Sequence, residues 1–261
     1  MQNFSFIGKY LAYRFFSQTK HDVHPPFLFD LITRVFEDKS KISDYIKVEN
    51  LKKELLGNNK TINVEDYGAG SSVNKGNQRT IGQIAKNSSK PVKYGRLLYR
   101  LVKYFNTHTI LELGTSLGLS SAYMTLANPD GKVITIEGCP NISSVATENF
   151  KKLNIKNIEL ITGKFDNELT KVINKTDKID FIFIDGNHRK EPTIKYFEQI
   201  LQKTNNDSVL IFDDIHWSKG MEAAWKYVKN HTSVTLTVDI FFMGLVFLKK
   251  ELSKENFIIR F

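Results

Sequence analysis

A strand, a glycine-containing turn and a helix follow one another between residues 109 and 127, and this order constrains the fold more than any other feature. Residues 109–113 are apolar and predict a short strand, whereas residues 119–127 predict a helix. Gly114 lets the backbone turn sharply, and Gly118 leaves room for a ligand at the N-terminus of the helix. In an open α/β sheet, such a turn seats a polar or anionic group of a ligand at the carboxyl edge of the parallel strands.

An acidic residue after the next strand indicates what that ligand is. Residues 132–136 predict a strand, and the carboxylate of Glu137 at its end is suited to accept hydrogen bonds from two ribose hydroxyls. The glycines are spaced Gly-x-x-x-Gly, so the turn lacks the middle glycine that admits a pyrophosphate in the Gly-x-Gly-x-x-Gly dinucleotide pattern. The order therefore favours a nucleoside cofactor, while helix packing alone is the other explanation of the glycines.

Glu112 lies two residues before Gly114, and the pattern Glu-x-Gly-x-x-x-Gly resembles the first motif of the class I S-adenosylmethionine-dependent methyltransferases. The resemblance implies that S-adenosylmethionine is the cofactor, with Glu112 near its amino acid end, Glu137 on its ribose and Ser120 on its carboxylate. Asp166 is either an adenine contact or only a helix cap. The cofactor-binding residues expected from the resemblance are Glu112, Gly114, Thr115, Ser116, Gly118, Ser120, Glu137, Gly138, Phe165, Asp166 and Asp185.

The rest of the C-terminal portion alternates strands and helices. Five apolar segments predict strands, and two of them, residues 181–184 and 209–212, are apolar on both faces, as central strands of a helix-covered parallel sheet are. Residues 234–249 predict a terminal hairpin with its turn at Met243-Gly244, which must be antiparallel because a parallel crossover needs a dozen or more residues. Five parallel strands plus this hairpin resemble the seven-stranded, Rossmann-like α/β sheet of the methyltransferases.

The first 88 residues differ from the rest, because helical patterns dominate them. Helices are expected over residues 4–16, 28–37 and 46–56. We therefore expect a basic, mainly helical N-terminal extension or cap over residues 1–88, followed by an S-adenosylmethionine-binding methyltransferase domain over residues 89–261.

Two segments before the glycine turn are candidates for covering the cofactor. The stretch from Asp66 to Ser71 contains two glycines and is expected to be a flexible loop and a candidate lid. Residues 88–105 resemble the segment that catechol O-methyltransferase-like enzymes fold over the cofactor. That resemblance implies that Ser88 and Ser89 lie near the cofactor.

The positive charge of the chain is unevenly placed. Residues 1–105 contain 18 lysines and arginines against 9 acidic residues, whereas residues 106–261 contain 19 of each. The excess indicates either a solvated basic surface or an anionic partner, such as an acidic or phosphorylated acceptor, a membrane surface or a nucleic acid. Peripheral membrane contact and a homodimer are both left open. The single cysteine allows no internal disulfide, which fits a cytoplasmic location.

Acidic residues follow two of the central strands. Asp185 comes directly after one strand, and Asp213 and Asp214 follow the next, 28 residues after Asp185. One strand-helix-strand step separates them, so they are expected to be neighbours at the same sheet edge. Three carboxylates there would repel one another unless a cation intervenes, and oxygen ligands favour Mg²⁺ or another divalent cation. The alternative is that Asp213 or Asp214 caps the next helix, a role that Ser218 could also fill.

His188 adds a candidate base to these acids. The set Asp185, Asp213 and Asp214, with a histidine three residues after the first acid, resembles the metal-dependent macrolide-sugar O-methyltransferases; the catechol and caffeoyl-CoA enzymes would have an asparagine in place of Asp214. The resemblance implies metal ligands Asp185, Asp213 and Asp214 and catalytic residues His188 and Asp185. A cation would lower the pKa of the acceptor hydroxyl, and the histidine would remove its proton. His216 is the alternative base.

The leading hypothesis is therefore a metal-dependent O-methyltransferase for a small hydroxylated acceptor, such as a sugar, a phenol or a lipid head group. An RNA or other nucleic-acid methyltransferase using the basic N-terminal region is the alternative. It is weakened because base-amine methylating enzymes typically carry Asn/Asp-Pro-Pro-Tyr/Phe where this chain has Asp185-Gly186-Asn187-His188. A third hypothesis is a non-enzymatic module, in which the aromatic stripe of residues 6–16 docks on the core, on a partner or at a lipid interface.

Overall fold

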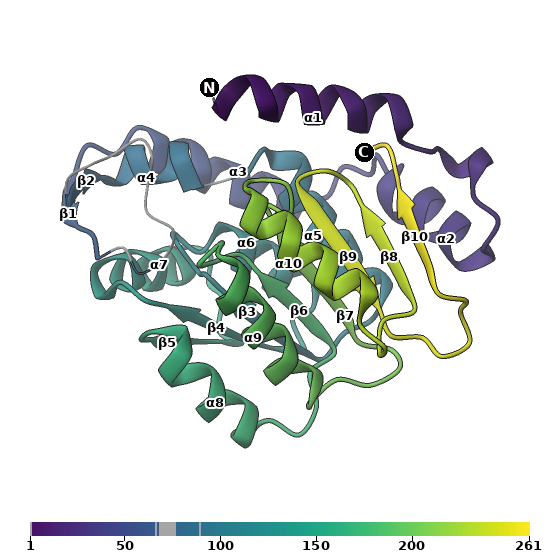
Figure 1. Cartoon of the computed structure of the whole chain (residues 1–261). Coiled ribbons are helices and arrows are strands. Elements are labelled where there is room, and N and C mark those ends of the chain that lie inside the picture. The colour runs from purple at the N-terminus through teal and green to yellow at the C-terminus, as the bar shows by residue number, and fades with distance from the viewer. Residues whose placement is uncertain (1, 66, 68–76, 89) are drawn as a thin grey trace. The chain divides into compact units, whose positions relative to one another are not determined.

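The structure is a computed structural model, and it describes residues 2–65, 67, 77–88 and 90–261. Figure 1 shows the whole chain, which forms two compact units. Residues 39–175 make up one, and residues 1–38 together with 176–261 make up the other.

The unit of residues 39–175 contains the predicted glycine turn. Its three long strands are parallel neighbours in the order β3-β4-β5, and their registers pair Leu113 with Ile136 and Glu137 with Thr162. The strands are β3 (Thr109–Leu113), β4 (Lys132–Glu137) and β5 (Ile158–Thr162), besides the short antiparallel pair β1 (Thr61–Asn63) and β2 (Gln78–Thr80). The helices are α3 (Ser43–Leu56), α4 (Ile81–Ser88), α5 (Val92–Tyr104), α6 (Leu119–Ala127), α7 (Pro140–Lys152) and α8 (Phe165–Lys175).

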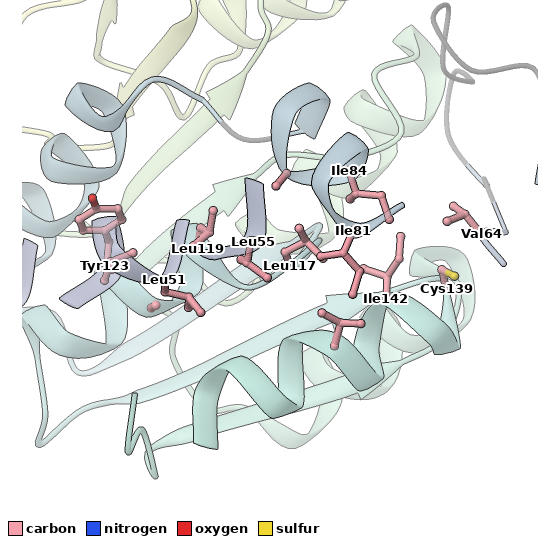
Figure 2. Close-up of a cluster of buried hydrophobic side chains, with 14 of the residues drawn as sticks. Leu51, Leu55, Val64, Ile81, Ile84, Leu117, Leu119, Tyr123, Cys139 and Ile142 are labelled. Carbon is pink, nitrogen blue, oxygen red and sulfur yellow. The ribbon is translucent and has the colours of Figure 1, made fainter. Parts of the chain in front are cut away.

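A hydrophobic cluster joins the early helices of this unit to the glycine turn (Figure 2). Leu51 and Leu55 of α3 and the isoleucines of α4 lie against Leu117 and Leu119, which flank Gly118. Ile142 of α7 closes the other side of the same cluster. Since buried apolar side chains are close-packed, these contacts hold the turn in place. Residues from the stretch 43–88 therefore support the turn, and the division into an extension or cap and a methyltransferase domain stays a prediction.

The second unit contains the strands that carry the predicted acids. Its strand order is β10-β8-β9-β7-β6, in which β6 and β7 are parallel and β9 is antiparallel to both of its neighbours. The strands are β6 (Phe181–Ile184), β7 (Val209–Asp213), β8 (Leu236–Asp239), β9 (Met243–Phe247) and β10 (Glu255–Ile258). The helices are α1 (Gln2–Phe16), η1 (Lys20–Asp22), α2 (Pro26–Leu31), η2 (Ile32–Phe36), α9 (Lys190–Leu201) and α10 (Lys219–Asn230). Figure 1 shows α9 and α10 side by side.

The predicted α/β fold, with parallel strands followed by an antiparallel hairpin, is confirmed, and two details differ. The strand β10 was not predicted; it pairs with β8 in parallel and extends the sheet by one strand. The hairpin turn was predicted at Met243-Gly244 but lies just before these residues, at residues 240–242, where Phe241 adopts a φ of 71°. Gly244 is instead a strand residue whose missing side chain makes space for the ring of Trp225, 2.6 Å from where a Cβ would stand.

The helices predicted in the first 88 residues are confirmed, but those residues divide between the two units. Residues 1–38 pack with the C-terminal strands: the Tyr13 hydroxyl donates to the Ile259 carbonyl at 2.7 Å, and a β-bridge joins Gln18 to Ile259. The expected methyltransferase domain over residues 89–261 stays a prediction. Within the loop predicted from Asp66 to Ser71, only Tyr67 is a described residue. The rest of that loop lies outside the described residues.

Candidate functional site

The glycine turn after β3 needs both of its glycines, each for a separate reason. Gly114 has a φ of 104° and donates its N–H to the Ile136 carbonyl at 3.0 Å, so the chain turns immediately after the strand. Gly118 has a φ of 81°, and a Cβ there would lie 2.5 Å from the Phe150 ring of α7. Packing of Phe150 therefore requires a glycine at position 118, and the contact of Gly118 with a ligand stays a prediction.

A buried polar network ties the turn to the strands beneath it. Glu112 is fully buried, and its carboxylate accepts hydrogen bonds from the hydroxyls of Ser120 and Ser121 in the first turn of α6. Thr135 of β4 donates to the same carboxylate at 2.7 Å, and the Thr115 hydroxyl lies 2.6 Å from that of Thr135. A buried carboxylate is stable only when several donors compensate for lost water. Glu112 and Ser120 thus fix the start of α6, and their contact with a cofactor stays a prediction.

Glu137 is held at the end of β4 by backbone donors. Its carboxylate accepts the N–H of Ser116 from the turn at 2.8 Å and the N–H of Cys139 at 2.9 Å. Ser116 itself has a φ of 48°, a left-handed conformation that is uncommon for residues with a side chain. These contacts orient a half-buried carboxylate at the carboxyl edge of the sheet, and its contact with a ribose stays a prediction.

Two residues that contributed little to the sequence argument lie against this turn. The Ser88 hydroxyl, at the end of α4, is 2.9 Å from the hydroxyl of Ser116, and its expected place near the cofactor stays a prediction. The ring of Tyr67 lies on the backbone of Gly138, 2.8 Å from where a Cβ would stand, with Lys164 Nζ 4.5 Å from its centroid. The sequence offered one signal for Tyr67, which is that it is an aromatic residue within a glycine- and serine-rich stretch. Ser89 lies outside the described residues.

Phe165 and Asp166 open α8 directly after β5. Phe165 is half-buried and Asp166 is exposed in the first helical turn, where an acidic side chain also interacts favourably with the helix dipole. The Gly163 N–H donates to the Glu137 carbonyl at 2.9 Å, so both residues lie on the strand edge that carries Glu137. Their position would allow a contact with adenine. The position of Asp166 fits the alternative equally well, in which it only stabilises the N-terminus of α8.

The acidic residues of the other unit follow neighbouring strands, as predicted. The parallel register of β6 and β7 pairs Ile184 with Phe212, which sets Asp185 beside Asp213 at the carboxyl ends of the two strands. Asp213 is almost completely buried, whereas Asp185 is half-buried. Asp214 adopts a φ of 53° and donates its N–H to the Phe242 carbonyl at 2.7 Å. The capping alternative does not need these acids, because Ser218 caps α10 by accepting the Met221 N–H at 3.1 Å.

His188 lies next to Asp185 on a strained turn. Its Nε2 is 3.4 Å from Asp185 Oδ1, and both Asn187 and His188 have positive φ angles, 68° and 38°. Non-glycine residues in this region cost free energy and cluster at functional sites. The side chain of Asn187 is held by Tyr196 and Arg189, at 2.9 and 2.6 Å, which supports the turn from the outside. Asp185 and His188 therefore form a carboxylate–imidazole pair.

His216, the alternative base, is held between two carboxylates. Its Nε2 lies 2.7 Å from Asp239 Oδ2 and its Nδ1 lies 3.5 Å from Glu222 Oε1, and its ring stacks on Phe241. Lys9 of α1 pairs with the same Glu222 oxygen at 2.8 Å. Since both ring nitrogens of His216 face carboxylates, the geometry favours a structural role for it and leaves His188 as the better candidate base.

The predicted trio of acids does not form a metal-binding group in this conformation. Among the described residues, no three His, Cys, Asp or Glu side chains are grouped so that they could hold a metal ion. Asp185 and Asp213 have the oxygen ligands and the strand positions that a hard divalent cation prefers. Mg²⁺ is commonly held by only one or two protein carboxylates and completes its shell with water and substrate oxygens. The residues present are therefore compatible with a cation.

Comparison with known proteins agrees with this arrangement. Residues 111–215 match the family model described as a methyltransferase domain. A catechol O-methyltransferase of Niastella koreensis is 30% identical over 124 residues, which is 46% of this chain and 55% of that protein. A probable caffeoyl-CoA O-methyltransferase of Dictyostelium discoideum is 31% identical over 119 residues, 44% of this chain and 47% of that protein. The chain thus spans about half the length of the curated relatives it matches.

Two further matches complete the comparison. A tRNA (guanine-N(7)-)-methyltransferase of Mycoplasma mobile is 38% identical over 78 residues, 30% of this chain and 38% of that protein. The crystal structure of an S-adenosylhomocysteine-bound methyltransferase from Podospora anserina has a TM-score of 0.61 at 14% identity and covers 88% of this chain and 99% of that one. The structural match shows a shared fold, and the sequence matches confirm the resemblance to class I S-adenosylmethionine-dependent O-methyltransferases that the motifs predicted.

Proposed function

We propose that this chain transfers a methyl group from S-adenosylmethionine to a hydroxyl of a small acceptor molecule. The observation that carries the proposal is the position of Glu137. Backbone N–H groups of Ser116 and Cys139 orient its carboxylate beside the glycine turn. A carboxylate held in this way at the end of the second strand can accept both ribose hydroxyls of a nucleoside. The matches to catechol and caffeoyl-CoA O-methyltransferases support an oxygen acceptor.

Positioning of the cofactor is the proposed role of the unit of residues 39–175. The turn would contact the amino acid part of the cofactor, Glu137 its ribose, and Phe165 with Asp166 its adenine. Glu112 supports this arrangement by fixing the first turn of α6 through Ser120 and Ser121. Because methyl transfer from a sulfonium is an in-line displacement, most of the rate enhancement is expected to come from orientation and desolvation of the two reactants.

Proton removal is the proposed role of the Asp185–His188 pair. As the acceptor oxygen forms its bond to the methyl carbon, the bond from that carbon to sulfur breaks and the hydroxyl proton passes to the imidazole. Asp185, 3.4 Å from Nε2, would orient the ring and stabilise its protonated form. The cationic sulfonium becomes a neutral thioether, so charge is conserved once the imidazole holds the proton.

A divalent cation, Mg²⁺ among others, is the second part of the proposal. Asp185 and Asp213 would hold it, with Asp214 as the third predicted ligand. Such a cation lowers the pKa of a bound hydroxyl and so supplies the nucleophile near neutral pH. The side-by-side ends of β6 and β7 support this assignment.

Cofactor binding tests the first part of the proposal. Titration calorimetry with S-adenosylhomocysteine should give saturable binding to the wild-type chain. Glu137→Gln should weaken it by about 10- to 100-fold, because hydrogen bonds to a charged acceptor contribute roughly 1.5–3 kcal/mol. Glu148→Gln, an exposed glutamate of α7, is the matched control and should bind like the wild type. Equal affinity of Glu137→Gln and wild type would refute the ribose assignment.

Chelation tests the second part. Methyl transfer to a panel of catechols, phenols and sugars should stop in excess chelator and return on addition of Mg²⁺ or Mn²⁺. Undiminished turnover in chelator would refute the role of the cation. The Asp185–His188 pair would then be the only proposed group that removes the proton of the acceptor hydroxyl.

The nucleic-acid alternative is not favoured. Its support is the positive charge of residues 1–105 and a match over 78 residues to a tRNA methyltransferase. The O-methyltransferase matches are longer, and the residues after β6 are Asp185-Gly186-Asn187-His188 rather than the pattern typical of base-amine methylation. Transfer of a labelled methyl group to RNA, but to none of the small acceptors, would reverse this preference.

A further inference from the structure

Helix α1 presents an apolar stripe that nothing in the described chain covers. Ile7, Leu11 and Phe15 follow one another at four-residue spacing and are exposed to 56, 62 and 81%. The ring of Phe16, 68% exposed, packs edge-on against Phe15 at the end of the helix, with ring centroids 5.1 Å apart. Four-residue spacing puts side chains on one face of a helix, so these residues form a continuous stripe, named here the outer stripe.

The opposite face of α1 packs on an aromatic cluster of its own unit. Phe6, Tyr10 and Tyr13 surround the ring of Phe241, with centroid distances of 5.2, 5.0 and 5.3 Å. Lys9 adds the ion pair with Glu222 of α10. The aromatic stripe considered in the sequence analysis is therefore mainly the docking face of the helix. The outer stripe is a second, independent apolar surface, and the helix does not need it to attach to the unit.

Basic residues accompany the outer stripe, and a glycine leaves open space beside it. Residues 1–21 contain Lys9, Arg14 and Lys20 and no acidic residue. Arg260 lies at the end of the helix, where it donates to the Arg14 carbonyl at 2.9 Å. Gly8 lies on the same side as the stripe, and a Cβ there would meet nothing within 4 Å. Lys9 and Lys20 form ion pairs with Glu222 and Glu37, so the positive charge next to the stripe comes mainly from Arg14 and Arg260. An apolar helix face flanked by basic residues is typical of helices that lie in the interface of an anionic bilayer.

The area of the outer stripe argues against a second copy of the chain as its occupant. A fully exposed aromatic side chain contributes roughly 150–250 Å², and the aliphatic Ile7 and Leu11 contribute less. The two partly exposed phenylalanines and these two residues therefore fall short of the ~800 Å² per partner of a stable dimer. Reversible attachment to a membrane needs only a few inserted side chains together with basic residues. In the part of the chain that the structure describes, no helix is long and apolar enough to cross a bilayer.

We propose that α1 docks this protein on an anionic lipid surface, with Ile7, Leu11, Phe15 and Phe16 inserted among the head groups and Arg14 and Arg260 close to the lipid phosphates. The inward face of α1 keeps the helix attached to its unit during docking. This peripheral attachment is independent of the methyl-transfer proposal, since none of these residues belongs to the proposed cofactor or acceptor site.

Vesicle sedimentation with the full chain tests the proposal. The wild type should sediment with vesicles of phosphatidylcholine containing phosphatidylserine, less with phosphatidylcholine alone, and less at high salt. Gly8→Glu should reduce binding at least fivefold, because it adds a charge to the stripe at a position with open space. Gly8→Ala is the matched control, because it changes the same position without adding charge and should bind like the wild type.

A second variant pair and the oligomeric state complete the test. Leu11→Ser should lower binding to the phosphatidylserine vesicles, whereas Ile46→Ser, at a residue 59% exposed in α3, should not. Failure of the wild type to bind the anionic vesicles, or equal binding by Gly8→Glu, would overturn the proposal. So would a dimer in analytical ultracentrifugation that Gly8→Glu dissociates, since a second copy would then be the occupant. Circular dichroism of each variant distinguishes lost binding from lost folding.

Discussion

The carboxyl ends of the strands are stabilised differently in the two units. In the unit of residues 39–175, the turn after β3 rests on a buried carboxylate network around Glu112 and on the apolar cluster of α3, α4 and α7. In the other unit, the residues after β6 and β7 adopt left-handed backbone conformations at Asn187, His188 and Asp214. The first edge holds one such residue with a side chain, Ser116, and rests on the buried network and the apolar cluster; it is called the rigid edge below. The second edge holds three such residues and is called the strained edge.

This difference fits the two proposed tasks. A cofactor site gains affinity when its donors and acceptors are already in position, because less conformational entropy is lost on binding. Residues that move protons or meet varied acceptors are often held in uncommon backbone conformations, for which the surrounding fold compensates. Perturbation of the first edge should therefore affect stability and cofactor affinity, and perturbation of the second should affect turnover.

The largest effect is expected at the strained edge. Asp185→Ala should lower kcat by at least about 1,000-fold, a change of roughly 4 kcal/mol in the activation free energy, because the imidazole of His188 loses its carboxylate partner. Affinity for S-adenosylhomocysteine should largely survive. Kinetics on an identified acceptor and calorimetry give the two readouts. A variant that retains turnover but loses the cofactor would reverse the division of roles between the two edges.

At the rigid edge, Gly118→Ala should cost about 2–4 kcal/mol of folding free energy, because it combines a positive φ with a Cβ placed 2.5 Å from Phe150. Urea denaturation measures the loss. Adding Phe150→Leu should restore the part of the folding free energy that is lost to the clash with the ring. The part that is lost to the positive φ should remain. Gly220→Ala is the control, because a Cβ there meets its nearest atom at 3.6 Å; it should be neutral or slightly stabilising. Equal effects of the two alanines would contradict the packing argument.

Alkaline pH should weaken the unit that contains α1. Burial raises the pKa of Tyr13 to about 12 from the ordinary value of 10.0. The folded state therefore keeps the phenol proton over a range in which the unfolded chain loses it, so the stabilisation is fully present below pH ~10 and is lost as pH rises toward 12. The loss attributable to Tyr13 should reach roughly 2–3 kcal/mol. Tyr13→Phe should be less stable at pH 8 yet show a shallower decline above pH 10 in denaturant titrations.

The smallest effect is expected at Ser88. Ser88→Ala removes the hydroxyl that lies 2.9 Å from Ser116, a contact on the exposed side of the turn. The cofactor affinity should fall no more than about tenfold, since one neutral hydrogen bond contributes roughly 0.5–1.5 kcal/mol. Folding stability should not change measurably. A loss as large as that of Glu137→Gln would mean that Ser88 contacts the cofactor itself rather than supporting the turn.

Several elements could be predicted from local sequence because their cause is local. The strand of residues 109–113 and the helix of residues 119–127 have the predicted bounds. Their apolar periodicity and the glycine between them leave few alternatives for the backbone. The adjacency of Asp185 and Asp213 was also predicted, since it follows from one strand-helix-strand step. The hairpin turn was wrong by a few residues because a glycine was interpreted as a turn residue, when its role is to admit Trp225.

The sequence by itself determined the order of strands and helices, the glycine turn, and the acids that follow the strands, because each depends on residues close together in the chain. Tertiary structure alone decided what those residues contact. Phe150 lies 32 residues after Gly118, and its ring fills the space where a side chain at position 118 would stand. The carboxylate of Glu112 accepts hydrogen bonds from Ser120, Ser121 and Thr135 only once β3, α6 and β4 have packed together. Tertiary structure also decided that one apolar face of α1 is packed and the other is exposed. The packed face contacts Phe241, which lies more than 200 residues further along the sequence. Close packing selects partners by shape and distance in space, and neither is encoded in sequence spacing.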